Sequence, residues 1–300
     1  MKRLRSNAAG IADQIVNAGA NAATGLLVYP FLPPEDTGDV LFALACGYFL
    51  VGVARAVVGD VLLAHTSRYD GEVRHRHVTD AAATAVGLGF LGTALAAVAS
   101  AAGPHYLVLL VWLAPFLPFL LLHDAGRYAF LAGGRPERAL TSDLTYVAVQ
   151  AVCLVALLRW GARQADGSPV PEIFLLAWGF GAVAGAISFV VRARVNPLRG
   201  AIPAWLAETR HLSGWFTATA LLGQAQVQLV YTLVVGVLSK PALATLRLAQ
   251  YGLLMPAQNL QIALASLLVP RMSRLAHAGD VAGLRRLVRR ALGLTALAAG

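Results

Sequence analysis

The sequence predicts an all-α integral membrane protein, a multi-pass bundle of helices. Its 300 residues are 58% hydrophobic and only 13% charged, with a mean hydropathy of +0.65, whereas a soluble domain carries about 25% charged residues. The charged side chains cluster between apolar runs of about the 20 residues that a helix needs to cross a bilayer. These observations exclude an ordinary cytosolic enzyme, a disordered chain and a fibrous repeat.

Polar breaks divide the chain into eight spans and the start of a ninth. The eight are expected near residues 10–32, 40–63, 78–101, 105–122, 143–158, 171–191, 213–237 and 242–269. The ninth begins at Ala291 and has run too short a distance at Gly300 to cross a bilayer, so we expect a fragment of a longer protein. Pro115, Pro118 and Pro256 are expected to bend their helices.

The basic residues predict the orientation of the bundle. Of the 24 Lys and Arg residues, 19 fall at the N-terminus or in the loops after the second, fourth, sixth and eighth spans. Cytoplasmic loops hold the excess of Lys and Arg, so the N-terminus is predicted to be cytoplasmic. The net charge of +9 is therefore attributed to topology, and no nucleic-acid partner is expected.

Two inner segments have the pattern of amphipathic helices on the membrane surface. Pro203–Leu212 and Asp280–Arg290 each set apolar side chains beside charged ones, which suits contact with anionic headgroups. The alternative for both segments is a solvated connector that only sets the topology.

Catalytic and metal-binding patterns are weak, so we expect neither an enzyme nor a cofactor. Cys46 and Cys153 lie inside apolar runs, which disfavours both a disulfide and a metal–thiolate site. His65, His75 and His77 lie in or beside one short basic loop, which we expect to be solvated, with no metal bound. The chain has no nucleophile motif and no phosphate-binding glycine loop.

Three spans each place polar side chains on one helical stripe. Such residues should face a protein interior or an aqueous cavity, since exposure to lipid is costly. The stripes comprise Asp13, Asn17, Asn21 and Thr24; Thr217, Gln224, Gln228 and Tyr231; and Arg247, Gln250, Leu254, Gln258 and Gln261. Each stripe could line a shared cavity, or it could tie helices together by hydrogen bonds.

Arg55 and Arg247 are the two basic residues inside apolar spans. A buried guanidinium keeps its proton and must find an anion or several acceptors. Asp13 and Asp60 are possible partners for Arg55, but both are expected nearer the cytoplasmic end, and Arg247 has no obvious carboxylate. We therefore predict a cavity that binds an anionic substrate such as a phosphate or pyrophosphate.

Two segments carry a family resemblance. The first is His123–Asp143, with Asp124, Arg127, Gly134-Arg135-Pro136 and Asp143; the second is Leu246–Gln250, followed by Pro256, by Leu268–Arg271 and by Gly279-Asp280. Together they resemble the fourth-to-fifth-helix loop and the eighth helix of polysaccharide-export flippases in the multidrug/oligosaccharidyl-lipid/polysaccharide exporter superfamily.

The resemblance implies a MATE-like architecture of two six-helix lobes around a cavity that opens alternately to each side. Residues 1–191 would form the first lobe, 192–212 a cytoplasmic linker with an interfacial helix, and 213–300 the start of an incomplete second lobe. Asp124, Arg127, Arg135 and Asp143 would form a cytoplasmic loop motif. Arg55 and Arg247 resemble cavity arginines of lipid II flippases, but the first span offers Asp13, Asn17 and Asn21 instead, which disfavours lipid II.

The leading hypothesis is a flippase of the bacterial cytoplasmic membrane that moves a polyprenyl-pyrophosphate-linked oligosaccharide outward for envelope polysaccharide synthesis. Its partners would be this substrate, membrane lipids, and glycosyltransferases or a polymerase of the same pathway. One alternative is a cation-coupled multidrug antiporter that uses Asp13. Another is a non-transporting membrane scaffold that recruits partners through its basic loops.

Overall fold

The computed structural model describes residues 2–104, 107–253, 268–269 and 271–299, and among these residues the regular elements are helices. An isolated bridge between Arg163 and Pro169 lies in the loop after α7. The predicted all-α bundle is confirmed. The longer helices are α1 (Lys2–Leu26), α2 (Pro34–Ala54), α4 (Gly71–Ala102), α6 (Leu117–Ala132), α7 (Pro136–Trp160), α8 (Glu172–Ala193), α9 (Ile202–Leu233), α10 (Lys240–Leu253) and α12 (Val281–Ala299), and the short ones include α3 (Asp60–Ala64) and α5 (Leu110–Leu113).

Five helical segments are long and apolar enough to cross a membrane. They are Pro34–Arg68, Gly71–Ala102, Pro136–Trp160, Glu172–Ala193 and Ile202–Leu238. Each contains one of the predicted spans, namely the second, third, fifth, sixth and seventh, apart from the first residue of the sixth. The described chain is therefore that of a multi-pass membrane protein.

Three other predicted spans differ from the structure. The first lies mainly in α1, which ends at Leu26 rather than Leu32. The fourth is broken at Ala114–Phe116 by a 3-10 turn that contains Pro115, and helix α6 then runs ten residues beyond the predicted end. The eighth begins as α10, but residues 254–267, with Pro256, Gln258 and Gln261, lie outside the described residues.

The two predicted interfacial helices are not separate elements. Residues 203–212 form the first turns of α9, which continues into the following apolar run. Residues 281–290 likewise begin α12, which continues through Ala291 to Ala299. No proline separates either amphipathic segment from the apolar residues after it, so the helix has no reason to end there.

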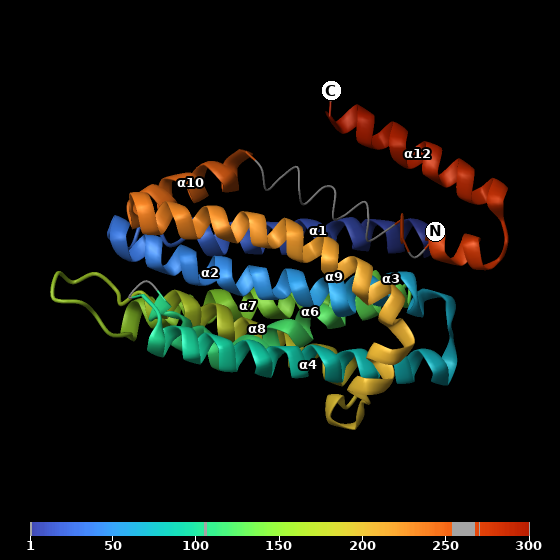
Figure 1. Ribbon diagram of the computed structural model, residues 1–300, viewed down its shortest axis with the longest axis horizontal. Helices are drawn as coiled ribbons and strands as arrows, with labels where there is room; N and C mark the ends of the chain where they lie inside the picture. Colours follow the sequence, from blue (N-terminus) through green and yellow to red (C-terminus); the bar gives the residue numbers. More distant parts are fainter. Residues whose placement is uncertain (1, 105–106, 254–267, 270, 300) are drawn as a thin grey trace.

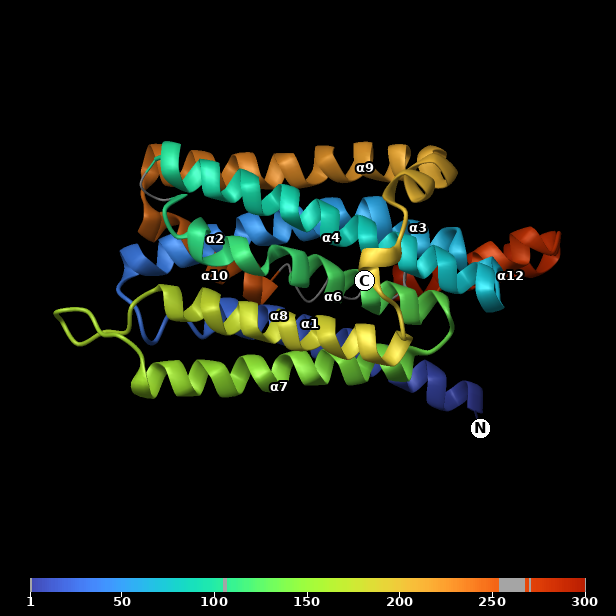
Figure 2. The same ribbon diagram turned by 90° about the horizontal axis from the view of Figure 1, so that it is seen from below.

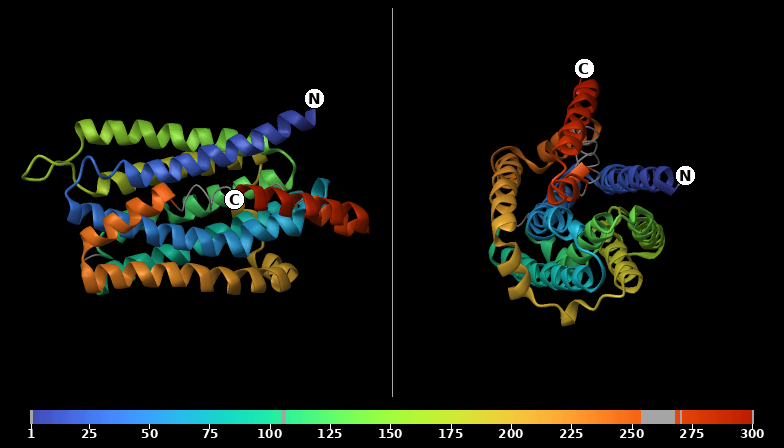
Figure 3. Two further views of the ribbon diagram at one scale, coloured as in Figure 1. Left: turned by 90° about the horizontal axis from the view of Figure 1, so that it is seen from above. Right: turned by 90° about the vertical axis from the view of Figure 1, so that its right-hand side faces the viewer.

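The long helices run side by side along one axis (Figure 1). The N-terminus, the turn before α4, the α6–α7 turn and the start of α9 lie at the same end, which we call the basic end (Figure 2). The loop that follows α7 projects from the opposite end. Seen along the axis, α2 lies between the α6–α8 group and α9, and α12 extends away from the other helices (Figure 3).

The packing resembles that of a membrane bundle. Trp178, Phe189 and Leu117 are fully buried in a core shared by α2 to α8, whereas the outward faces carry large apolar side chains. On α4, for example, Phe90 and Val98 are 62% and 65% exposed. Water does not favour such faces, and lipid does.

Helix α2 passes into α3 through a π-helical turn, η1 (Arg55–Gly59). The wider turn interrupts the regular hydrogen-bond ladder. The indole Nε1 of Trp205 in α9 donates a hydrogen bond to the carbonyl oxygen of Val57 at 3.3 Å. The irregular turn is therefore stabilised by a side chain from a distant helix.

Close helix contact at Gly89 provides a test of the packing. A Cβ atom there would lie 2.3 Å from the backbone Cα of Pro118, which cannot move aside as a side chain could. We expect Gly89→Ala to destabilise the protein by about 1–3 kcal/mol, measured by thermal unfolding in detergent. Gly223→Ala is the matched control, because nothing lies within 4 Å of a Cβ at that site; equal unfolding temperatures would contradict the α4–α6 contact.

Candidate functional site

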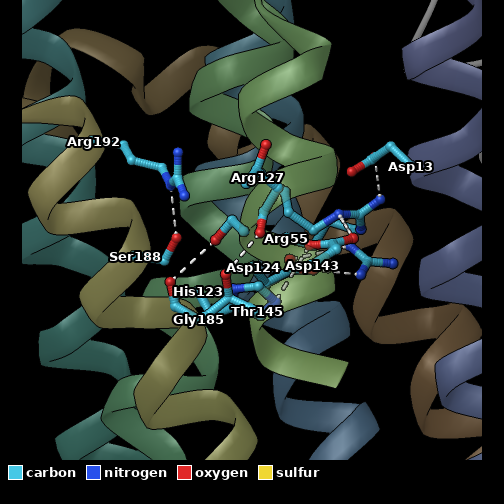
Figure 4. Close-up of polar contacts among 12 residues, drawn as sticks. Asp13, Arg55, His123, Asp124, Arg127, Asp143, Thr145, Gly185, Ser188 and Arg192 are labelled. Carbon is cyan, nitrogen blue, oxygen red and sulfur yellow. Dashed lines mark hydrogen bonds and ion pairs between the residues drawn. The ribbon is translucent and has the colours of Figure 1, made fainter. Parts of the chain in front are cut away.

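A buried network of ion pairs joins four helices of the bundle (Figure 4). At its centre is Arg127 of α6, which is 2% exposed. Its Nη2 donates to Asp13 Oδ2 of α1 at 2.9 Å, and its Nε lies 2.8 Å from Asp143 Oδ2 of α7. One guanidinium thus lies between carboxylates from two other helices.

The same face of α6 makes a second ion pair one turn earlier. Arg55 Nη2 donates to Asp124 Oδ1 at 2.7 Å, and Arg55 Nε donates to Asp124 Oδ2 at 3.3 Å. This two-point contact joins η1 to α6 in the geometry that a guanidinium and a carboxylate prefer. The guanidinium also lies 5.4 Å from the ring centre of Tyr128.

His123 extends the network toward α7 and α8. Its Nε2 lies 3.4 Å from Asp143 Oδ1, and its ring stacks on Tyr146. Gly185 of α8 leaves room for the ring, since a Cβ there would lie 2.4 Å from His123 Nδ1. His123 was not a predicted site residue, although its i, i+4 spacing from Arg127 places both on one face of a helix.

The charges of the network do not balance. Its three carboxylates, Asp13, Asp124 and Asp143, face two guanidiniums, Arg55 and Arg127, so these five groups carry one unbalanced negative charge when all are ionised. In a buried environment neutrality is favoured because isolated charges are costly.

These contacts correct two predictions. Asp124, Arg127 and Asp143 do not form a cytoplasmic loop motif: they lie within α6 and α7 and are buried, and only Arg135 occupies an exposed turn. Arg55 does not await an external anion in this arrangement, because Asp124 pairs with it. The apolar run ends before Asp124, so the sequence predicted a loop there. Helix α6 nevertheless continues through Asp124 and Arg127 to Ala132.

A second set of polar contacts lies between α2, α9 and α10. Arg247 is 5% exposed, and its Nη1 donates to the hydroxyl of Tyr231 at 2.8 Å. That hydroxyl donates in turn to Gln250 Oε1 at 2.6 Å. Gln228 Nε2 lies 3.3 Å from Cys46 Sγ, and the Gln224 side chain lies against Gly52. Two predicted cavity residues, Arg247 and Gln250, therefore meet at the Tyr231 hydroxyl, and two others, Gln224 and Gln228, contact α2 from α9.

The polar stripe of α1 makes contacts with several helices. Asp13 pairs with α6, Asn21 accepts a hydrogen bond from Tyr48 of α2 at 3.3 Å, and Thr24 accepts one from Gln150 of α7 at 2.7 Å. Asn17 is half-buried. The stripe could line a cavity or tie helices together by hydrogen bonds, and Asp13, Asn21 and Thr24 each bond to another helix.

A separate cluster lies at the basic end. His65, which follows α3, and His77 of α4 are 6% and 1% exposed, and both lie about 3 Å from Glu208 of α9. The expected solvated loop is therefore wrong for these two histidines, although His75 is exposed. Spacing within the loop could not reveal Glu208, because it comes from a helix 143 residues further on than His65.

The helices and buried charges define a polytopic membrane protein with an internal polar site. Among solved structures, a MOP superfamily transporter from Pyrococcus furiosus Vc1 (DSM3638) has a similar fold. The TM-score is 0.69 at 12% identity, covering 97% of this chain and 68% of that one. The report of that structure describes a binding pocket of reverse polarity. No family model and no curated protein sequence matches the chain.

The chain therefore shares the fold of this transporter, in agreement with the MATE-like architecture that the family resemblance implied. The protein that shares this fold is described as a transporter.

Arg127 provides a test of the ionic network. Arg127→Gln would leave Asp13 and Asp143 buried without their shared cation, so we expect a loss of about 3–5 kcal/mol in stability. Thermal unfolding in detergent would measure it. Arg74→Gln is the control, since Arg74 pairs with Asp70, whose side chain is 93% exposed, and such a surface pair contributes at most about 1 kcal/mol. Similar losses in the two variants would argue against the network.

Proposed function

We propose that this protein is a membrane transporter that flips an anionic, lipid-linked oligosaccharide, with a polyprenyl pyrophosphate carrier, across the bacterial cytoplasmic membrane. The similarity of its fold to a MOP superfamily transporter supports the transporter class. The observation that carries the substrate class is Arg247, a permanent cation buried within α10 and oriented by Tyr231. A guanidinium in a low-dielectric site favours an anion such as pyrophosphate.

A pocket at the basic end suits the first step of the proposed transport, the binding of the substrate headgroup at the membrane surface. The pocket is lined by Arg74, His75, Arg135 and Arg138 together with apolar side chains that include Val78 and Phe130. A headgroup that carries phosphate would meet these cations at the membrane surface, while its lipid tail would remain among apolar groups. Charge and polarity at this end therefore suit an anionic amphiphile.

The antiporter alternative is not favoured by the contacts of Asp13. That alternative needs Asp13 to bind a cationic drug or its coupling ion, but Arg127 lies 2.9 Å from the Asp13 carboxylate. The scaffold alternative would require the interior arginines to be dispensable, which the experiment on Arg247 addresses.

Arg247 should be needed for transport and much less for folding. We expect Arg247→Ala, in the whole protein expressed in a polysaccharide-producing host, to cause lipid-linked intermediates to accumulate on the cytoplasmic face. Polymer output should fall at least tenfold, as measured by labelling of surface polysaccharide. Arg210→Ala, an exposed arginine on α9, is the control. Normal output from a well-expressed Arg247→Ala strain would count against the substrate class, and full output together with dependence on residues 280–290 would support a scaffold.

The basic end should face the cytoplasm. In a background with Cys46 and Cys153 replaced by alanine, Glu72→Cys lies at that end and Ala165→Cys lies in the loop at the opposite end, both exposed. We expect a membrane-impermeant maleimide added to intact cells to label Ala165→Cys and to label Glu72→Cys only after permeabilisation. The reverse pattern would overturn the orientation.

A further inference from the structure

Three potential metal ligands converge at the basic end, outside the ionic network. His65 Nε2 and His77 Nε2 lie 3.1 Å and 3.0 Å from the same oxygen, Glu208 Oε1. All three ligand atoms lie within 4.8 Å of one another. The residues come from the end of α3, the second turn of α4 and the second turn of α9.

Two of the three spacings, those from each histidine nitrogen to Glu208 Oε1, are close to those of a tetrahedral metal site. Zinc bonds to imidazole nitrogen and carboxylate oxygen at about 2.0–2.2 Å, which sets neighbouring ligand atoms about 3.3 Å apart in a tetrahedron. His77 is 1% exposed, yet neither of its ring nitrogens makes a well-formed hydrogen bond to the described residues. A metal ion between the three groups would satisfy its Nε2.

The chemistry of the ligands restricts the choice of ion. Imidazole nitrogens suit zinc and neighbouring transition metals, whereas magnesium and calcium prefer oxygen ligands alone. The Glu208 side chain is 39% exposed, which gives an ion a path from solvent. Three protein ligands would leave a fourth position for water.

We propose that His65, His77 and Glu208 form a binding site for a transition-metal ion of the zinc class that fastens α9 to the α3–α4 turn. This site is independent of the proposed transport function, since binding of the ion requires only these three residues. A bound ion would hold α9 in the position seen here.

Arg68 disfavours the tautomer of His65 that binds a metal through Nε2. Its Nη2 lies 2.7 Å from His65 Nδ1. A guanidinium can only donate, so Nδ1 accepts and the ring proton lies on Nε2, which faces Glu208. Metal binding displaces the Nε2 proton, and Nδ1 takes up a proton once Arg68 leaves. Arg68 is exposed, and its removal should favour the metal-bound form.

The test is titration of the purified, metal-stripped full chain in lipid nanodiscs with Zn²⁺, followed by calorimetry. We expect one saturable site per chain. His77→Ala and Glu208→Gln should each weaken binding at least tenfold, whereas Arg68→Ala should tighten it several-fold. The control is His75→Ala, an exposed histidine two residues from His77, which should bind as the unchanged protein does.

X-ray absorption of the zinc-loaded protein should show nitrogen and oxygen ligands and no sulfur, which would exclude binding at Cys46 or Cys153. Absence of saturable binding, unchanged affinity in both ligand variants, or a loss in His75→Ala would overturn the proposal. If His77→Ala fails to fold, as judged by gel filtration, Glu208→Gln and Arg68→Ala decide. A purely structural cluster predicts no gain in zinc affinity from Arg68→Ala.

Discussion

The guanidinium of Arg127 is the constraint on which the bundle depends. It contacts carboxylates of α1 and α7 from a position on α6, and one turn away Asp124 pairs α6 with Arg55. Two residues of α6, one turn apart, thus connect it to α1, α7 and η1. Because these charges are out of water, loss of one partner exposes the others to the full cost of burial. The network therefore favours a single arrangement of these helices.

The contacts on the two sides of α2 differ in kind. Toward α6, its continuation η1 is held by the Arg55–Asp124 ion pair. Toward α9, α2 meets amide groups, with Gln228 near Cys46 and Gln224 against Gly52. Interhelical contacts of the second kind contribute about 0.6–2 kcal/mol each. A movement of α9 relative to α2 would therefore break these contacts more readily than the ion pair toward α6. The histidine cluster lies at the end of this same weaker boundary.

The sequence predicts this fold well where apolar runs set the helix. Helices α4, α7 and α8 each contain the span predicted for them, apart from one residue of α8, because the apolar run in each has clear ends. It fails where a helix outlasts its apolar run: Arg127 was counted among the loop arginines that set topology, and it lies buried in α6. Pairing is also hidden from the sequence, since Arg55 and Asp124 are 69 residues apart. Only tertiary structure brings such partners together, so charge counting alone gave Arg55 the wrong role.

The π-helical turn η1 changes the direction in which the side chains of α3 point, relative to a regular continuation of α2. It accommodates one residue more than an α-helical turn, and one residue corresponds to a rotation of about 100°. Arg55 is the first residue of η1, and His65 directly follows α3. The extra residue therefore turns His65 by about 100° from the direction it would have in an uninterrupted α-helix, and His65 contacts Glu208 of α9 while Arg55 contacts Asp124 of α6. One continuous helical segment thus contributes Arg55 to the ionic network on its α6 side and His65 to the histidine cluster on its α9 side.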